Sequence, residues 1–423
     1  MKRAVIWYGY MVASSLCLAL LITLAFPRPA SAQELHAVLL RSDPAAGSTL
    51  PQPPTAIRLW FSEPVQLVGQ PITVFAPSGA QFTTGGVREQ GGEVEVPVHP
   101  LQQGTYLVSW QVISNDTHPA SGSFTFSIGH AGGPWTETVG GGLSPAGFWL
   151  QVSSHLLHFL GYALGFGTLA FLLLVLAPLK LTHEPILLQL WRLCNLGILI
   201  LILAEGVALC AQVISLSPST SFYAPIAAEL LASSFGRLLA LRLAAAFLLW
   251  ICLGAVRQDY RKGVTAALVV GIALAFIDGT ASHALSARLL WLALIANTLH
   301  ISSMGVWLGG LITLLVLWGE KVVQGSRLAM LHLFGKLAAI AVVELALTGI
   351  MMAWLIVARP EDILVSTYGL VLVSKAVALL APLLFVVLSR RNLHERERWW
   401  RLEALTLLGV ITLAAILVTL PPL

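Results

Sequence analysis

An aspartate and a histidine stand two residues apart in the stretch SNDTHP, which runs from Ser114 to Pro119. Asp116 and His118 lie between segments in which apolar and polar residues alternate, as they do in β-strands. In an extended backbone, side chains two residues apart point to the same face, so this carboxylate and this imidazole could bind one small ion together. The same spacing also suits a turn-forming aspartate beside a surface histidine, and the pair alone does not decide between the two.

The same part of the chain offers two further ligands of the same kind, His36 and Glu63. The four cysteines all fall in apolar runs elsewhere: Cys17, Cys194, Cys210 and Cys252. A metal bound here must therefore use nitrogen and oxygen donors. From Gln33 to Gly132 the chain has seven acidic residues against three arginines, although its net charge as a whole is +4. This acidic balance favours a cationic ligand and argues against nucleic acid as a partner.

Residues 1–32 have the pattern of a secretory signal peptide. Lys2 and Arg3 precede an apolar run, and the small residues Ala30, Ser31 and Ala32 form a cleavage site. Because the apolar run is long for a signal peptide, an uncleaved N-terminal anchor is the alternative. Both interpretations predict that the segment carrying the candidate ligands is exported.

The exported segment, residues 33–129, is predicted to be an all-β sandwich of the immunoglobulin-like type. Short alternating runs are separated by Gly, Pro, Ser and Asn, and we expect strands at 57–61, 72–75, 94–98, 105–114 and 123–128. In the run TYLVSWQVIS, one face is formed by Tyr106, Val108, Trp110 and Val112. That face should lie in the core.

The remainder of the chain is predicted to be an all-α membrane domain of about eight helices, residues 148–423, after a Gly-rich linker at 130–147. The chain is 57% hydrophobic and only 10% charged, with a mean hydropathy of +0.82. About eight apolar runs approach the ~20 residues needed to cross a bilayer. Lys and Arg concentrate after the first, third, fifth and seventh runs, so the positive-inside rule places the β-domain outside the cytoplasmic membrane.

The stretches HAVLLRSDPAAGSTLPQPPTAIRLWFSEPV and LQQGTYLVSWQVISNDTHPASGSFTFSIG strongly resemble the periplasmic copper-binding protein CopC over nearly the whole exported segment. The resemblance implies a β-sandwich that binds Cu(II) through a histidine near the mature N-terminus and the Asp and His of the D-x-H element. Carried over by motif, these ligands are His36, Asp116 and His118, with Glu63 as a weaker neighbour. Cu(II) favours such nitrogen and oxygen donors.

This sequence departs from the CopC pattern at its N-terminal end. In relatives whose histidine is the first mature residue, the terminal amine and the imidazole chelate the metal together, whereas here the cleavage site implies Gln33 as the first residue. Either cleavage occurs elsewhere, or a backbone nitrogen or water takes the place of the amine. The exported segment also contains no methionine, so the Met-rich Cu(I) site of some relatives is missing.

The membrane half resembles CopD, the integral partner of CopC, from about His155 to the C-terminus. The motifs that carry this resemblance are HLLHFLGYALGFG, FGRLLALRLA, HISSMGVWLGG, STYGLVLVSKAVALL and RWWRLEALTLLGVITLAAILVTLPPL. A fusion of the two modules is a known arrangement in this family. The resemblance therefore implies one chain that joins a copper-binding domain to a copper-handling membrane domain.

Several polar residues of the membrane half are predicted to line a copper path in its outer half. The candidates are His155, His158, His283, His300 and Met304. His300 and Met304 are four residues apart on one helix face, and an imidazole with a thioether suits Cu(I). His155 could instead be a headgroup-level anchor and His283 a loop residue.

Charged residues also fall inside the apolar runs, namely Glu205, Arg242, Glu344, Lys375 and Glu403. Glu344 and Lys375 could form a structural pair or continue a path inward. Arg242 and Glu403 could lie at helix ends or form interior pairs. An ionisable group in the middle of a membrane helix costs about 3 kcal/mol, so such residues normally face a packed interior or a water-filled cavity.

These features predict copper binding outside the cytoplasmic membrane and copper transport across it, in copper homeostasis or resistance. The predicted partners are the copper ion, the lipid bilayer, and a copper chaperone or an oxidase. The sequence has no Walker loop, G-x-S-x-G elbow or HExxH helix, so we expect neither an ATP-driven pump nor an enzyme. The alternatives are a haem-binding membrane redox protein and an assembly factor that delivers copper to an oxidase.

Overall fold

The computed structural model describes residues 37–78, 80–82, 86–98, 102–114, 117, 119–129, 145–217, 222–256, 260–280, 289–357, 360–391 and 395–420. The expected signal peptide, most of the linker, and His36, Asp116, His118 and His283 lie outside the described residues. The chain divides into two compact units. One contains Gln33–Gln151 and Ala208–Leu238, and the other contains Val152–Val207 and Leu239–Leu423.

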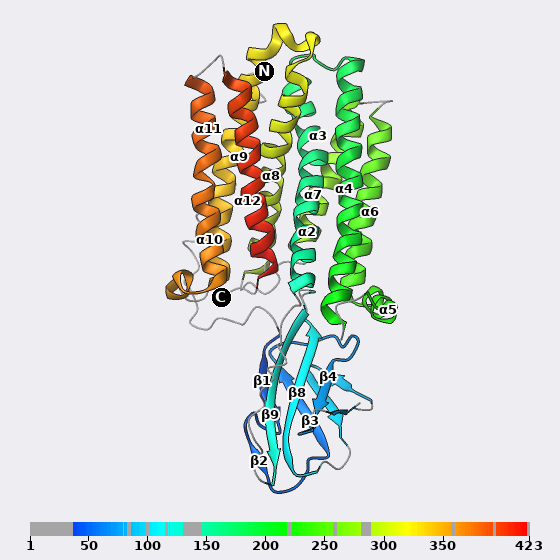
Figure 1. Cartoon of the computed structure of the whole chain (residues 1–423). Coiled ribbons are helices and arrows are strands. Elements are labelled where there is room, and N and C mark those ends of the chain that lie inside the picture. The colour runs from blue at the N-terminus through cyan, green and yellow to red at the C-terminus, as the bar shows by residue number, and fades with distance from the viewer. Residues whose placement is uncertain are drawn as a thin grey trace. The chain divides into compact units, whose positions relative to one another are not determined.

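The exported segment forms the predicted β-sandwich (Figure 1). The four-stranded sheet has the order β1 (Leu39–Asp43), β3 (Ala56–Phe61), β7 (Glu93–Pro97), β6 (Arg88–Gln90). The five-stranded sheet has the order β2 (Thr49–Leu50), β9 (Pro119–Ile128), β8 (Gly104–Ile113), β4 (Ile72–Phe75), β5 (Gln81–Phe82). Neighbouring strands are antiparallel, except that β2 runs parallel to β9.

The core of the sandwich consists of the apolar faces that alternation predicted. On β8 the side chains of Tyr106, Val108, Trp110 and Val112 are buried, and they pack with the buried residues of β9 and β3. β8 and β9 pair without interruption from Gly104–Ile128 to Ile113–Pro119. The stretch SNDTHP is therefore the connection at one end of this long hairpin, and a well-packed core sets the position of that end.

Within the described residues, eight helical segments are long and apolar enough to cross a membrane. The first is α2 (Pro145–Tyr162), which continues through η1 (Ala163–Gly167), α3 (Thr168–Phe171) and η2 (Leu172–Leu176). The others are α4 (Glu184–Leu216), α6 (Ser234–Ala255), α7 (Tyr260–Gly279), α8 (Leu290–Trp318), α9 (Arg327–Ile356) preceded by η4 (Lys321–Ser326), α10 (Thr367–Ala378) with α11 (Leu380–Arg391), and α12 (Arg396–Thr419). The sequence did not predict the short helical elements α5 (Ala224–Ala232) and η5 (Pro360–Leu364), nor the short strands β1, β2, β5 and β6 of the sandwich.

Glycines allow the first segment and α8 to approach closely. A Cβ atom added at Gly309 would overlap the main-chain carbonyl of Ala163, and one added at Gly167 would overlap that of Gly305. Small residues let membrane helices come into backbone contact, where dispersion forces hold them together. The glycines of HISSMGVWLGG therefore serve packing, and they fix α8 against the helix that carries His158.

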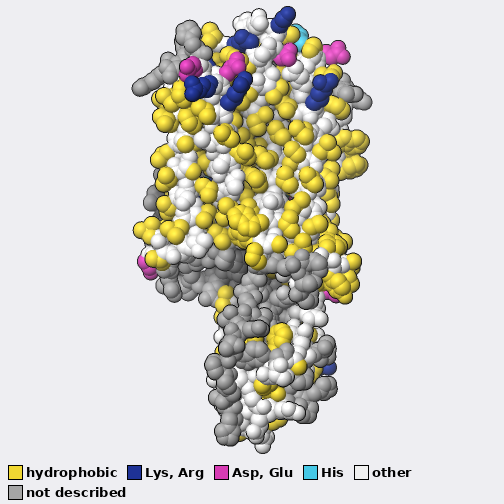
Figure 2. Space-filling view, viewed as in Figure 1, with side chains coloured by type: hydrophobic (Ala, Val, Ile, Leu, Met, Phe, Trp, Pro, Cys, Tyr) yellow, Lys and Arg dark blue, Asp and Glu magenta, His cyan; other side chains and the backbone are white. Residues whose placement is uncertain are grey.

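On the face shown in Figure 2, the Lys and Arg side chains of the helical bundle gather at one end, while hydrophobic side chains cover the rest of the helices. The described basic residues between the first and second, fifth and sixth, and seventh and eighth segments include Lys180, Lys321 and Arg396. Because successive helices reverse direction, these connections lie at the same end of the bundle. This distribution is the one that the positive-inside rule uses.

Candidate functional site

Three segments that carry predicted copper ligands converge in the sandwich. The N–H of Ala37 donates to Ser114 Oγ at 3.1 Å, and both residues are buried, with exposures of 3% and 0%. The N–H of Val38 donates to Ser62 Oγ at 3.0 Å, and the N–H of Ser62 donates to the carbonyl of Val38 at 2.9 Å. These bonds bring together the residue after His36, the residue before Glu63 and the first residue of SNDTHP.

The backbone of SNDTHP differs from the extended strand that the sequence suggested. Thr117, which lies between Asp116 and His118, has a φ of 70°, in the left-handed region, and its N–H donates to the carbonyl of Ser114 at 3.0 Å. The extended spacing was therefore wrong at this position. The connection between β8 and β9 is short and must reverse the chain, which favours a residue with positive φ.

The acidic residues on the outer face of β7 form surface ion pairs. Arg58 Nε donates to Glu95 Oε2 at 2.8 Å, and the Arg58 side chain also lies 3.9 Å from Asp43 and 4.0 Å from Glu93. The hydrogen bond and the charge of Glu95 raise the pKa of Arg58. Part of the negative charge of the sandwich is therefore compensated away from the converging segments.

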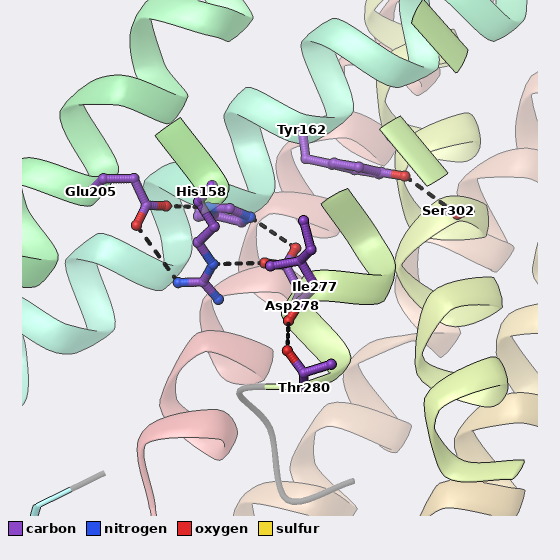
Figure 3. A network of polar contacts seen from close by, with 8 residues as sticks. His158, Tyr162, Glu205, Ile277, Asp278, Thr280 and Ser302 are labelled. Atoms are coloured by element: carbon purple, nitrogen blue, oxygen red, sulfur yellow. Dashed lines mark hydrogen bonds and ion pairs between the residues drawn. The ribbon is translucent and has the colours of Figure 1, made fainter. Parts of the chain in front are cut away.

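In the membrane half, four ionisable side chains from four helices form a closed ring of contacts, which we call the buried charge ring. Its members are His158 on α2, Glu205 on α4, Arg242 on α6 and Asp278 on α7. His158 Nδ1 lies 2.9 Å from Glu205 Oε1, and His158 Nε2 lies 2.9 Å from Asp278 Oδ2 (Figure 3). Arg242 Nε donates to Asp278 Oδ1 at 2.9 Å, and Arg242 Nη1 lies 3.7 Å from Glu205 Oε2. The four side chains are 5%, 4%, 12% and 6% exposed.

Three residues of the buried charge ring, His158, Glu205 and Arg242, were named from the sequence, and the structure shows which side chains they contact. Both ring nitrogens of His158 contact carboxylates, so a metal at His158 would have to displace one of them. Arg242 forms interior pairs with Asp278 and Glu205, so the alternative of a position at a helix end is wrong for this residue. Asp278 was not among the residues that the sequence indicated. The available signal was a single acid near the end of an apolar run, in a chain whose third apolar run contains Arg237 and Arg242.

His300 presents one ring nitrogen in a form suited to binding a metal. Its Nδ1 lies 2.9 Å from Thr348 Oγ1. Thr348 uses its only hydroxyl proton to donate to the carbonyl of Glu344 at 2.6 Å, so this oxygen must accept from His300. The proton therefore sits on Nδ1, and Nε2 carries the lone pair, as in metal-bound histidines whose other nitrogen is hydrogen-bonded. Met304 follows one turn later on α8.

The other predicted membrane residues have separate surroundings. The ring of His155 stacks on Phe159, with centroids 6.4 Å apart. Glu344 accepts a hydrogen bond from Ser303 Oγ at 2.8 Å, and Glu403 accepts one from Trp307 Nε1 at 2.9 Å. Among the residues that the structure describes, no group of three or more His, Cys, Asp or Glu side chains is arranged to hold a metal ion. The copper path therefore remains a prediction.

Comparisons with known proteins connect these features to a family. Residues 39–129 match the CopC domain, and residues 328–419 match copper resistance protein D. The copper resistance protein C of Pseudomonas syringae pv. tomato is 36% identical over 104 residues, which cover 22% of this chain and 82% of that protein. The chain belongs to the copper resistance protein C family.

Two further comparisons cover different shares of the chain. The copper transport protein CutJ of Bacillus subtilis is 22% identical over 408 residues, covering 91% of this chain and 74% of that protein. The crystal structure of PcoC, a methionine-rich copper resistance protein from Escherichia coli, aligns at 32% identity with a TM-score of 0.20, over 22% of this chain and 99% of that one.

The CopC and CopD domains make this a membrane protein with a copper-related function. Of the residues named above, Glu344, Thr348, Lys375 and Glu403 fall inside the matched CopD range. His300 and the buried charge ring precede this range. They lie between the residues that match the two family models, and only the overall likeness to CutJ extends over that part of the chain.

Proposed function

We propose that this chain captures Cu(II) on its exported sandwich and moves copper inward through the helical bundle. His36, Asp116 and His118 bind the ion, and Glu63 lies nearby as a weaker ligand. The bond from Ala37 to Ser114 is the observation that carries this proposal, because it holds the residue after His36 against the first residue of the loop that contains Asp116 and His118.

The arrangement of charge supports an exported sandwich. On the face shown in Figure 2, the Lys and Arg side chains of the bundle gather at one end, which the positive-inside rule assigns to the cytoplasm. The sandwich is acidic, which raises the local concentration of a cation around it. The Gly-rich linker would keep a captured ion at a high effective concentration near the bundle.

Within the bundle, His300 is the residue best suited to receive the ion. Its Nε2 carries the lone pair, and Met304 lies one turn away, so the two side chains offer nitrogen and sulfur to Cu(I). His155 and His283 would extend this path outward. A reduction of Cu(II) to Cu(I) before entry requires an external reductant.

The capture site is tested with the double variant Asp116→Ala and His118→Ala in the full chain. Electron paramagnetic resonance detects Cu(II) and is silent for Cu(I), so it reports the oxidised ion selectively. We expect the variant to lose most of its Cu(II) signal with resolved nitrogen coupling. His99→Ala, another histidine of the exported segment, serves as the control. An unchanged signal in the double variant would show that the ligands lie elsewhere.

The membrane path is tested with His300→Ala, which should keep Cu(II) binding by the sandwich but abolish copper accumulation in cells. The control is His332→Ala, which removes an exposed histidine from the neighbouring helix α9. Isotopic or mass-spectrometric measurement of cell copper distinguishes the two. If His300→Ala cells accumulate copper like the wild type, His300 is not part of the path.

A further inference from the structure

The buried charge ring costs more than a structural clamp needs. Removing charges from water costs several kcal/mol each, and a buried ion pair is often no more stabilising than apolar side chains of the same volume. Apolar packing and glycine contacts already hold the bundle together. A ring of four ionisable groups from four helices therefore calls for a role beyond helix packing.

The hydrogen bonds within the ring are unequal. Both oxygens of Asp278 accept hydrogen bonds at 2.9 Å, one from His158 and one from Arg242. Glu205 is bonded through Oε1 only. Its Oε2 is buried and has no hydrogen-bond partner, and the nearest guanidinium nitrogen is 3.7 Å away. A buried carboxylate oxygen without a donor is rare and normally has a functional or solvent-related explanation. Glu205 therefore has fewer hydrogen-bond donors than Asp278 and is the carboxylate of the ring that can take up a proton.

The total charge of the ring depends on one proton. Arg242 stays positive, and Asp278 stays negative between two donors. With one proton on the pair formed by His158 and Glu205, in addition to the N–H of the neutral imidazole, the ring is neutral. Without that proton, the ring carries one negative charge inside the bundle. The ring thus changes its charge by one unit through a single proton, and the short contact between His158 Nδ1 and Glu205 Oε1 is where the proton is shared.

We propose that Glu205 is the proton-exchanging carboxylate of the ring and that the chain exchanges a proton for each copper ion it moves inward. This rests on the proposed copper transport. The proton leaves the pair of His158 and Glu205 for water, and no electron is transferred in this step. Two positive charges in a medium of low dielectric constant repel strongly, so entry of a copper cation favours release of the proton, and proton uptake favours release of copper.

Polar contacts connect the helix that carries His158 to the helix that carries His300. Tyr162, one turn after His158 on α2, shares a hydrogen bond with Ser302 of α8 at 3.3 Å (Figure 3). The next residue of α8, Ser303, donates to Glu344 on α9, and Thr348 one turn further along α9 contacts His300. α8 therefore makes polar contacts with Tyr162 on α2 and with Glu344 and Thr348 on α9.

The ionisable groups around the pair of His158 and Glu205 come from the neighbouring helices. α2 contributes His158 and Tyr162, α6 contributes Arg242, and α7 contributes Asp278. α8 contributes the uncharged Ser302 through Tyr162. His155 on α2 stacks on Phe159. Glu205 is therefore the carboxylate of this set that accepts a single hydrogen bond.

Proton binding is tested without reference to copper by infrared difference spectroscopy of the full chain across a pH titration. We expect a carboxylic acid C=O band that disappears in Glu205→Gln and returns in Glu205→Asp. Gln keeps the size of the side chain and an oxygen that accepts from His158. Asp278→Asn should lose the band as well, because Arg242 and an ionised Glu205 then already balance in charge, whereas Glu403→Gln, outside the ring, should keep the band of Glu205. An unchanged band in Glu205→Gln would overturn the assignment.

Exchange is tested in proteoliposomes that contain an internal pH dye, with Cu(I) supplied outside under ascorbate and the membrane potential clamped. We expect copper entry to make the interior more alkaline as protons leave. In Glu205→Gln, the rate of proton release should be at least ten-fold lower than in the wild type. The matched control is Glu403→Gln, a buried carboxylate on α12 outside the ring, which should behave like the wild type.

The outcomes separate the two proposals. If the wild type takes up copper without proton release, or if Glu205→Gln releases protons at the wild-type rate, proton exchange is refuted and copper transport stands. If the wild type takes up no copper, the proposed transport fails, and the infrared band still decides whether Glu205 binds a proton.

Discussion

Arg58 in the sandwich and Arg242 in the bundle have similar partners but different surroundings. Each contacts acidic side chains from neighbouring elements, Arg58 at 2.8 Å from Glu95 and Arg242 at 2.9 Å from Asp278. The Arg58 side chain is 42% exposed, so water can replace any partner that it loses. The Arg242 side chain is 12% exposed and lies in an apolar bundle, where no such replacement exists.

This difference shows that burial decides what a charged cluster can do. Exposed ion pairs contribute little to stability and weaken with added salt, because water and ions screen them. Buried charges keep their full interaction, and a single unpaired charge is costly. One added proton or cation should therefore change the energy of the buried charge ring far more than that of the surface cluster around Arg58.

The largest expected effect is that of Arg242→Met. The substitution leaves Glu205 and Asp278 with one basic partner between them, and breaking a buried pair typically costs about 3 to 5 kcal/mol. Thermal unfolding in detergent, followed by a thiol-reactive dye or by tryptophan fluorescence, should show a much lower midpoint. A midpoint equal to that of the wild type would mean that the ring contributes nothing to stability and would remove the contrast with Arg58.

A smaller effect is expected for Thr348→Val, which removes the hydroxyl that holds His300 Nδ1–H. Loss of a partner of this kind lowers metal affinity about 10-fold or more, because the ring is no longer held in one tautomer and orientation. Copper uptake measured against copper concentration should show a higher half-saturation with little change in protein stability. Thr313→Val, which alters a threonine pair elsewhere in the bundle, is the control.

The buried hydroxyl of Tyr106 should make the stability of the sandwich depend on pH. Burial raises the pKa of its hydroxyl, which donates to the carbonyl of Gln102 at 2.9 Å. The folded state therefore binds this proton more tightly than the unfolded state, whose tyrosine titrates near pH ~10. The stabilisation is complete below that pH and is lost as the pH rises through the folded pKa. Tyr106→Phe should cost about 1 kcal/mol at neutral pH and should unfold with a weaker dependence on alkaline pH.

The smallest effect is expected for Arg58→Met. Removing an exposed arginine leaves Glu95 in contact with water, so the unfolding midpoint of the sandwich should not change measurably. Added salt should have little further effect on the variant. A large loss of stability here would contradict the conclusion that burial separates the two clusters.

Local patterns predicted most of the fold. The alternating run of β8 identified the buried face of Tyr106, Val108, Trp110 and Val112, because side chains of a strand alternate between two environments. Apolar runs of sufficient length identified all eight membrane segments of the described residues, because the thickness of a bilayer sets the length of a helix. The short helix α5 lacks both signals and was missed.

The sites followed from sequence only in part. Family motifs named His36, Asp116 and His118, and they could not show that Thr117 turns the backbone between the last two. Helical spacing paired His300 with Met304, but the hydroxyl that sets the tautomer of His300 comes from α9, 48 residues away. Contacts between helices depend on rotation and crossing angle, which no local pattern encodes.

The sequence by itself determined a β-sandwich, a set of membrane helices and the presence of isolated charges within them, because hydropathy and periodicity act over a few residues. Only the tertiary structure decided that His158, Glu205, Arg242 and Asp278 meet, since they come from four helices and span 120 residues. The reason is physical: an isolated charge in an apolar helix must find a partner, but close packing of the helices determines which partner it reaches.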